Sequence, residues 1–276
     1  MLDENKLDAP YDVVYCIDKK FNKQAFLSIA SLYKTNLNFN YKIFIIHKSP
    51  KSFMKFVKML KKLFPQCDIN LLKFKYNIKN YPNLKNSHVS EATYYRMFIA
   101  DHIQTSSNFI VYIDADAFFV KDIDYEIKKI KNLLKSQNLL LSAKTEYTLN
   151  QAPELFSRLD INNRYFNAGV MIINYKKWKS EKVSNELKNI VNEKFKKINY
   201  WDQDVINSYV DGKFEELPVE LNYVIDSNAN ESFIPKEISI VHYAGKNKPW
   251  DKKGNSLMQK TYYRELERYF QTLLNE

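Results

Sequence analysis

Glycine is unusually scarce in this chain. Only four glycines occur among 276 residues, and no two of them lie close together. Dinucleotide-binding loops and P-loops need two or three glycines within a few positions, and the nucleophile elbow of hydrolases needs two. The first glycine is Gly169, so the glycine-rich loop near the N-terminus of sugar nucleotidyltransferases is absent as well. A bound nucleotide would therefore need a metal ion or side chains to hold its phosphates.

Cysteine and long apolar runs are also lacking. The two cysteines, Cys16 and Cys67, cannot frame a disulfide scaffold or a four-ligand zinc site. No apolar run approaches the roughly 18 residues of a membrane-spanning helix. The polar, acidic stretch at residues 1–10 does not resemble a secretory signal peptide. We therefore expect a cytoplasmic protein, in which 45% hydrophobic residues supply a sizeable core.

Positive charge is in excess, with 42 basic against 32 acidic residues and a net charge of +10. Between Lys42 and Lys79 there are ten lysines and one acid, and apolar residues recur at helical spacing from Phe53 to Phe64. The lysines indicate either a solvated helix face or attraction to an anionic surface, such as phospholipid head groups or nucleic acid. Arginine is scarce here, which argues against base readout, and we expect no nucleic-acid partner.

Strand and helix patterns alternate along the chain. Buried-strand patterns occupy residues 12–17, 42–46, 109–113, 139–142, 169–173 and 238–242. Helical patterns occupy residues 23–35, 53–64, 90–102 (with Ser90 as N-cap), 125–137, 180–198, a shorter stretch from Trp201, and 256–274. No linker rich in proline, glycine or serine divides the chain. We predict one α/β domain with a helical C-terminal extension.

Two carboxylates, Asp114 and Asp116, directly follow the apolar strand pattern FIVYI. On extended backbone, side chains two positions apart point to the same side. At the C-terminal edge of an α/β sheet they would reach the crevice where ligands bind. Two such oxygen ligands suit Mg²⁺ or Mn²⁺, with diphosphate oxygens completing the shell. The alternative is a solvent-exposed acidic turn.

Three further segments carry polar groups that could meet a ligand. The stretch YFNAGV (165–170) allows a close approach to the backbone, or is simply a tight turn into a strand. The stretch WDQD (201–204) begins a predicted helix, where acids complement the helix dipole and an amide can bind substrate hydroxyls. In HYAGKNKPW (242–250), His242 is either a metal ligand or a packed ring, and Lys248 could meet phosphate.

In this order and spacing, the four segments resemble glycosyltransferase family 8, the retaining enzymes that include bacterial lipopolysaccharide galactosyl- and glucosyltransferases and glycogenin. The resemblance covers residues 12–250, and His-x-x-Gly-x-x-Lys-Pro-Trp is its most specific part. It implies one nucleotide-sugar-binding domain of the GT-A type with a mostly parallel sheet over residues 1–250, followed by a helical extension over 251–276. It also implies a UDP-sugar donor and Mn²⁺, with Mg²⁺ as the alternative.

The resemblance assigns roles by position. The metal ligands would be Asp114, Asp116 and His242. The uracil would be read by Cys16, Ile17 and Asp18, with Phe21 stacking on the base. Ala115 would lie beside the ribose, Gly245 and Lys248 would hold the diphosphate, and Arg96 would contact the donor. The donor sugar would be lined by Asn167, Ala168, Asp202 and Gln203. Two departures, Lys20 near the nucleotide and Glu146 near the sugar, leave the choice of sugar open.

Retention of configuration requires either a carboxylate nucleophile or attack from the face that the diphosphate leaves. The residue that would lie beneath the sugar is Gln203, whose amide is a poor nucleophile. We therefore favour same-face attack, in which the β-phosphate oxygen accepts the acceptor's proton and Asp202 holds sugar hydroxyls. Asp202 as the nucleophile is the alternative.

The acceptor carries no transferable motif. A composition rich in Lys, Asn, Ile and Tyr suggests an AT-rich bacterial genome, and therefore a surface polysaccharide or lipo-oligosaccharide. The aromatic and basic residues of the last helix suggest docking on the cytoplasmic membrane face beside a lipid-linked acceptor, and packing on the domain is the alternative. A competing function is a basic protein that binds glycan or nucleic acid on the same fold without transferase activity.

Overall fold

The computed structural model describes residues 12–36, 41–82, 89–225, 234–246, 248–250 and 257–275 of the chain. A seven-stranded sheet has the order β3-β2-β1-β4-β7-β6-β8. Its strands are β1 (Asp12–Ile17), β2 (Lys42–His47), β3 (Asp68–Lys73), β4 (Phe109–Ile113), β6 (Leu141–Thr148), β7 (Arg164–Asn174) and β8 (Glu215–Glu216). Only β7 runs antiparallel to its neighbours, β4 and β6, so the predicted mostly parallel sheet is confirmed.

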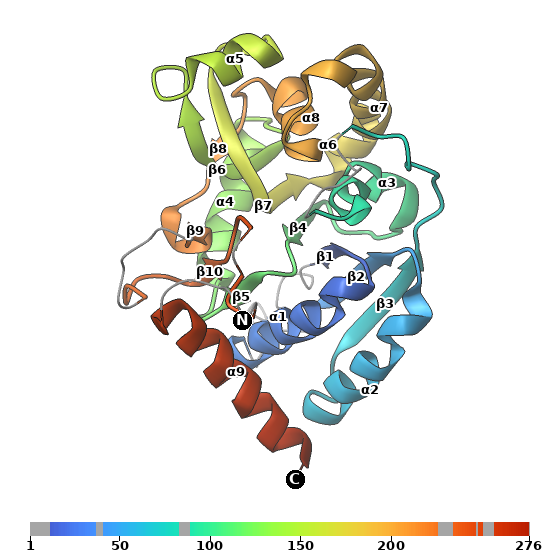
Figure 1. Cartoon of the computed structure of the whole chain (residues 1–276), viewed down its shortest axis with the longest axis vertical. Coiled ribbons are helices and arrows are strands. Elements are labelled where there is room, and N and C mark those ends of the chain that lie inside the picture. The colour runs from blue at the N-terminus through green and yellow to red at the C-terminus, as the bar shows by residue number, and fades with distance from the viewer. Residues whose placement is uncertain are drawn as a thin grey trace, which may run out of the picture.

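The two faces of this sheet carry separate hydrophobic cores, because side chains alternate along each strand. In β1, Val13, Tyr15 and Ile17 face one core, and Val14 and Cys16 face the other. The first core is covered by α1 (Asn22–Thr35), α2 (Met54–Leu63), α4 (Asp124–Ser136) and α9 (Leu257–Asn275). The second is covered by the 3-10 helix η3 (Glu91–Phe98) and by α3 (Ile99–His102), α6 (Tyr175–Ser180), α7 (Val183–Glu193) and α8 (Trp201–Val210). Figure 1 shows α1 and α2 toward one end of the molecule and α7 and α8 toward the other.

A second, three-stranded sheet has the order β5-β10-β9, with β5 (Ala117–Phe119), β10 (Ile240–His242) and β9 (Tyr223–Val224). β10 runs antiparallel to β5, and His242 is opposite Ala117. Because β5 directly follows Asp116, this pairing brings a histidine from late in the chain next to the two carboxylates.

Several elements differ from the sequence prediction. The helix predicted over 180–198 is the shorter helix α7, which begins just after Lys182 in a left-handed backbone conformation (φ 52°), and the separate helix α6 before it was not predicted. Ser90 does cap a helix by accepting from the Ala92 N–H, but most of that helix is 3-10. Strands β6 and β7 are longer than predicted. The prediction missed β3, β5, β8, β9, the helix α5 (Pro153–Leu159), and the short 3-10 helices η1 (Lys19–Phe21), η2 (Pro50–Phe53), η4 (Phe195–Lys197) and η5 (Val219–Leu221).

The C-terminal helix α9 packs against α1 and α2. Tyr263 and Phe270 are buried, and the Phe270 ring lies edge-on to Phe26 and Phe64. The Tyr262 hydroxyl donates to the carbonyl oxygen of Phe119 at 2.9 Å. These three aromatic residues therefore serve the core and are not free to contact a membrane. No helix within the described ranges combines the length and the apolar character that crossing a bilayer requires.

Candidate active site

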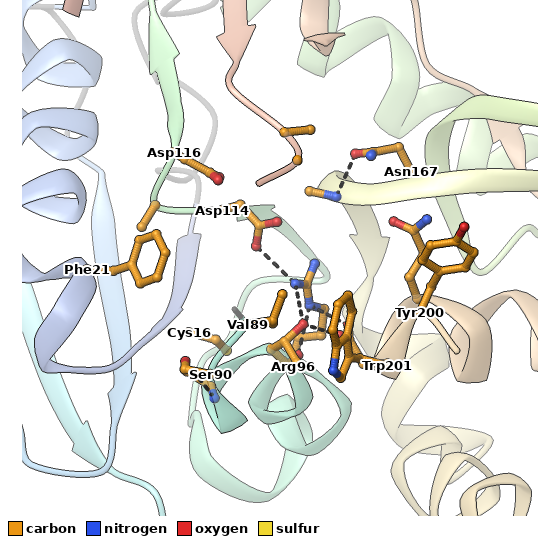
Figure 2. Close-up of a pocket in the computed structure, with 18 of the residues that line it drawn as sticks. Cys16, Phe21, Val89, Ser90, Arg96, Asp114, Asp116, Asn167, Tyr200 and Trp201 are labelled. Carbon is orange, nitrogen blue, oxygen red and sulfur yellow. Dashed lines mark hydrogen bonds and ion pairs between the residues drawn. The ribbon is translucent and has the colours of Figure 1, made fainter. Parts of the chain in front are cut away.

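A cavity of about 670 Å³ opens beside the C-terminal ends of β1 and β4. Thirteen of the residues predicted for the site line it: Cys16, Ile17, Phe21, Arg96, Asp114, Ala115, Asp116, Asn167, Asp202, Gln203, His242, Gly245 and Lys248. Phe21 and Asp116 lie on one side of it and Tyr200 and Trp201 on the other, as Figure 2 shows. Two predicted residues do not line it. Asp18 instead caps η1 by accepting from the Lys20 N–H at 2.8 Å, and Ala168 is buried in β7.

The Asp-x-Asp segment is a turn rather than the extended backbone that we predicted. The Ala117 N–H donates to the carbonyl oxygen of Asp114 at 3.1 Å, because the chain must turn there from β4 into β5. One flank is held by β7, through the Asp114 N–H to the Gly169 carbonyl at 2.7 Å. The other is held by the Tyr243 N–H, which donates to the Asp116 carbonyl at 3.0 Å. Both sheets therefore fix the turn.

Asp114, Asp116 and His242 form a cluster that fits a divalent cation. Each offers one ligand atom, and these atoms lie within 4.8 Å of one another. Two carboxylates and one imidazole are donors that Mn²⁺ accepts and that Mg²⁺ accepts less readily, because nitrogen is a softer ligand than oxygen. The alternative of a solvent-exposed acidic turn does not apply to Asp116, which is buried.

The tautomer of His242 follows from its neighbours. Its Nδ1 lies 2.9 Å from Oδ1 of Asn222, an acceptor, so Nδ1 carries the proton. The Asn222 amide is itself oriented by Nδ2 donating to Oδ1 of Asn167. The lone pair of Nε2 therefore faces Oδ1 of Asp116, 3.4 Å away. Two acceptors that face each other in a buried place repel unless a proton or a cation lies between them, so this arrangement is compatible with a metal site.

Gly169 is required at this centre for space. A methyl group on its Cα would lie 2.1 Å from Cε1 of His242, far inside contact distance. The glycine of the YFNAGV segment thus admits the imidazole ring to the backbone. We predicted that a ligand would approach the backbone closely at this segment. In the structure, the group that does so is the side chain of His242.

Lys248 and Gly245 lie beside the acidic cluster. The Lys248 ammonium is 2.5 Å from Oδ2 of Asp116 and donates to the Tyr243 carbonyl at 2.6 Å. Burial on its own would raise the pKa of Asp116, but the Lys248 ammonium holds that pKa well below its usual range. Asp116 is therefore ionised. Gly245 has φ 85°, a left-handed backbone conformation that glycine adopts without steric strain, so a glycine is favoured at this position.

Arg96 links the cluster to the helix α8. Its Nη2 lies 3.1 Å from Oδ1 of Asp114, its Nε lies 2.7 Å from Oδ2 of Asp202, and its Nη1 donates to the Ala168 carbonyl at 2.5 Å. Burial opposes the positive charge, but Asp114 and Asp202 hold the pKa of Arg96 above its ordinary value. A buried guanidinium with two carboxylates holds both in fixed orientations.

Asp202 keeps one carboxylate oxygen without a hydrogen-bond donor. Its Oδ1 accepts from the Thr93 hydroxyl, but Oδ2 is buried and accepts no hydrogen bond. The short distance to Arg96 Nε is an ion pair rather than a hydrogen bond, because that N–H is directed at the Thr93 carbonyl, 3.2 Å away. Burial raises the pKa of Asp202 to about 6. Asp202 is among the residues that line the cavity, and its Oδ2 keeps an unused hydrogen-bond acceptor position.

Residues 12–254 match the family model for Glycosyl transferase family 8. The chain belongs to this family. Among curated proteins it is 28% identical to a lipopolysaccharide 1,3-galactosyltransferase of Salmonella typhimurium, over 88% of this chain and 74% of that protein. It is 26% identical to a lipopolysaccharide 1,2-glucosyltransferase of Escherichia coli, over 87% and 73%.

The fold is also that of a solved galactosyltransferase. The crystal structure of LgtC in complex with donor and acceptor sugar analogs superposes with a TM-score of 0.78, covering 96% of this chain and 95% of that one. The two sequences are 17% identical, so this likeness shows the GT-A type fold alone. The predicted family and fold class are both confirmed.

Gln203 of this family 8 chain has its amide fixed on three sides. Its Oε1 accepts from the Ala168 N–H at 3.0 Å. Its Nε2 donates to Glu146 at 2.8 Å and to the Tyr165 hydroxyl at 3.3 Å. Glu146, the departure noted in the sequence, is thus a neighbour of Gln203, and burial raises its pKa.

The hydrophobic end of the family 8 cavity holds Cys16, Ile17 and Phe21. Burial raises the pKa of the Cys16 thiol, so the sulfur is a neutral contact surface. The Phe21 ring lies edge-on to Trp250, with centroids 6.4 Å apart, and this contact orients its face.

Sequence reasoning missed Asn222, Thr93 and the wall formed by Asn199, Tyr200 and Trp201. Thr93 lies three residues before Arg96, and Tyr200 and Trp201 lie directly before and at the start of the WDQD segment, so their positions in the sequence could have pointed to the site. Asn222 had none, since it lies 20 residues before the histidine that it orients.

Proposed function

We propose that this chain is a retaining hexosyltransferase that moves galactose or glucose from a UDP-sugar to a glycan acceptor of a bacterial surface polysaccharide or lipo-oligosaccharide. The observation that carries the proposal is the single cavity in which an acidic metal-ligand cluster, a lysine and a buried carboxylate oxygen without a donor converge. The names of the two lipopolysaccharide hexosyltransferases to which the chain is similar support a hexose and this acceptor class.

Asp114, Asp116 and His242 would hold Mn²⁺, with Mg²⁺ as the weaker alternative. Bound there, the cation would neutralise charge on the departing diphosphate. Lys248 would turn from Asp116 to a phosphate oxygen once the carboxylate has another positive partner. Its ammonium suits this because it is a point charge on a flexible stem. Gly245, with an open Cα, lets the diphosphate approach the backbone.

The nucleoside would occupy the other end of the cavity. Phe21 offers a ring for the uracil, Cys16 and Ile17 line the floor beside it, and Ala115 is small enough for the ribose to lie against. Asp18 would act on this end only through the turn that it caps.

The donor sugar would lie between Asn167, Asp202 and Gln203. Asp202 would accept a sugar hydroxyl with Oδ2, which is ion-paired with Arg96 but accepts no hydrogen bond. That contact replaces a missing hydrogen bond to a buried acceptor, which makes it worth more than one at the surface. Ala168 would contribute through its backbone, which orients Gln203 and Arg96.

Same-face attack fits these contacts better than double displacement. The Gln203 carbonyl oxygen already accepts a hydrogen bond, and a neutral amide is a weak nucleophile. The Asp202 carboxylate is tied to Arg96 and Thr93, which lowers its freedom to attack. The acceptor hydroxyl would then lose its proton to the β-phosphate oxygen of the leaving group.

We test this function by UDP release from a panel of UDP-sugars without acceptor, first with Mn²⁺ and then with EDTA. We expect slow hydrolysis of one UDP-hexose that EDTA abolishes and that Asp116→Asn abolishes. The matched control is Asp160→Asn, which changes an exposed aspartate paired with Lys197 and should hydrolyse at the wild-type rate. Hydrolysis of no donor at all would contradict the transferase proposal.

A further inference from the structure

The last acid of the WDQD segment has no role in the site described so far. Asp204 is fully buried and does not line the cavity, although Asp202 and Gln203 beside it both do. A buried carboxylate is costly unless it is paired and hydrogen-bonded. Its contacts therefore indicate what it is for.

One oxygen of Asp204 fixes a wall of the cavity. Oδ2 accepts from the backbone N–H of Asn199 at 2.7 Å and of Tyr200 at 2.8 Å. Asn199, Tyr200 and Trp201 all line the cavity, and Figure 2 shows the two aromatic rings opposite Phe21. Trp201 has φ 49°, a left-handed conformation that an aromatic residue adopts only when its surroundings impose it.

Arg158 supplies the counter-charge from the distant helix α5. Its Nη1 lies 2.8 Å from the same Oδ2 and also donates to the Lys197 carbonyl oxygen. Its guanidinium carbon is 5.9 Å from the centroid of the Tyr200 ring. One arginine thus neutralises Asp204 and holds the chain just before the wall.

The other oxygen of Asp204 reaches Gln203 through Tyr165. The Tyr165 hydroxyl donates to Oδ1 of Asp204 at 2.7 Å and accepts from Nε2 of Gln203 at 3.3 Å. Burial raises the pKa of Tyr165 far above its ordinary value, and Asp204 raises it further, so this hydroxyl keeps its proton. The direction of both hydrogen bonds is therefore fixed.

We infer that Asp204, paired with Arg158, is a positioning residue that sets both the wall formed by Asn199, Tyr200 and Trp201 and the side-chain amide of Gln203. It touches no ligand. The inference rests on the proposed function only in assuming that the cavity binds the donor. The orientation of the wall itself can be measured without any substrate.

The test uses the full chain labelled with 5-fluorotryptophan. The sequence has three tryptophans, so the fluorine spectrum has three resonances, and Trp201→Phe assigns the one of interest. We expect Arg158→Ala to shift or broaden the Trp201 resonance and to leave those of Trp178 and Trp250 in place. Arg158→Lys should restore it, because a single nitrogen makes both arginine contacts and an ammonium can replace it.

The matched control is Lys197→Ala. It removes an exposed ion pair with Asp160 beside Arg158 and does not touch Asp204. All three resonances should stay at their wild-type positions. An equally large change of the Trp201 resonance in Lys197→Ala would overturn the inference, because it would show that any disturbance of this region alters the wall, with no specific role for Arg158 and Asp204.

Tyr165→Phe separates the effect of Asp204 on Gln203 from its effect on the wall, because it removes the hydroxyl that links Asp204 to Gln203 and keeps the packing of the ring. We expect the Trp201 resonance to remain unchanged and kcat for UDP release to fall by roughly 10- to 100-fold, the size expected for misplacement of a group by about 1 Å. A wild-type kcat in folded Tyr165→Phe, together with a wild-type Trp201 resonance in folded Arg158→Ala, would overturn the inference. Absence of UDP release from the wild-type chain would instead contradict the proposed function and leave the fluorine result to decide on the wall.

Discussion

At the scale of single residues, the acidic centre depends on a glycine and an asparagine that are not among its candidate metal ligands. Gly169 leaves room for the His242 ring, and Asn222 determines which nitrogen of that ring carries the proton. Outer partners of this kind fix a ligand's orientation and tautomer, and their loss usually weakens metal binding substantially.

We expect Gly169→Ala to weaken Mn²⁺ binding by about 10-fold or more, since the added methyl group must displace His242. The same overpacking should lower the free energy of unfolding by about 1–3 kcal/mol. Calorimetric titration with Mn²⁺ and urea denaturation measure the two effects. Ile172→Val in the same strand is the control, with a similar loss of about 1 kcal/mol and unchanged Mn²⁺ affinity. Wild-type affinity in Gly169→Ala would contradict the placement of His242.

The raised pKa of Asp202 predicts a pH-dependent stability. Because the folded chain holds this proton up to about pH 6 and an exposed aspartate releases it near pH 4, the contribution to stability is present in acid and declines between these values. At about 1.4 kcal/mol per pH unit, the decline is up to roughly 3 kcal/mol.

Urea denaturation in EDTA at pH 4 to 7 measures this decline as a difference between the wild type and Asp202→Asn. The variant cannot titrate at this position, so it should gain stability relative to the wild type as the pH rises. Parallel pH profiles for the two proteins would show that the carboxyl is not buried as described.

At the scale of elements, the strands that form the centre of the sheet were predictable and its margins were not. β1, β2 and β4 are continuous apolar runs because both of their faces are covered, which gives a clear sequence signal. β3 lies at the edge with half-buried side chains, and β8 and β9 have only two residues each, so none of them produces such a run.

The same contrast holds for the site. The motif residues could be found because each segment has its own local pattern. Their partners could not be found, because these contacts join residues far apart in the sequence. Thr93 contacts Asp202 across 109 positions, and no local sequence pattern indicates that β10 pairs with β5. Helix α6 was missed, and the left-handed lysine that separates it from α7 has no compositional signature.

This break gives a prediction at the element scale. Lys182 has φ 52° between α6 and α7, and a left-handed conformation costs a residue with a Cβ about 1–2 kcal/mol. Lys182→Gly removes this cost, but the greater conformational freedom of glycine in the unfolded chain offsets part of the benefit. The substitution should therefore stabilise the protein by about 0.5–1 kcal/mol. The same change inside α6, Lys179→Gly, should instead destabilise it by about 1 kcal/mol. Urea denaturation measures the change in the free energy of unfolding for both variants. Changes of the same sign would contradict the left-handed conformation assigned to Lys182.

At the scale of the whole molecule, α9 belongs to the packed body. Its buried aromatic face closes the core above α1 and α2, and the Lys23 ammonium pairs with Glu267. Membrane association of the chain stays a prediction. It would have to use other groups, such as the exposed Arg264 and Arg268 of α9 or the exposed lysines of α2.

Phe270→Ala tests this packing directly. Because the ring is buried against Phe26 and Phe64, we expect a loss of about 3–5 kcal/mol in the free energy of unfolding, in buffer without lipid. The control is Tyr269→Ala, an exposed neighbour on the same helix, which should cost well under half as much. Equal, small losses for both variants would mean that α9 does not close the core.

The central claim is that the acidic cluster builds a metal-dependent nucleotide site. Isothermal titration calorimetry of UDP with the wild-type chain, in Mn²⁺ and then in EDTA, tests it most directly. We predict binding in Mn²⁺, loss of that binding in EDTA, and the same loss in Asp114→Asn with Mn²⁺ present. UDP binding that is equally tight in EDTA, or no UDP binding under either condition, would contradict the account.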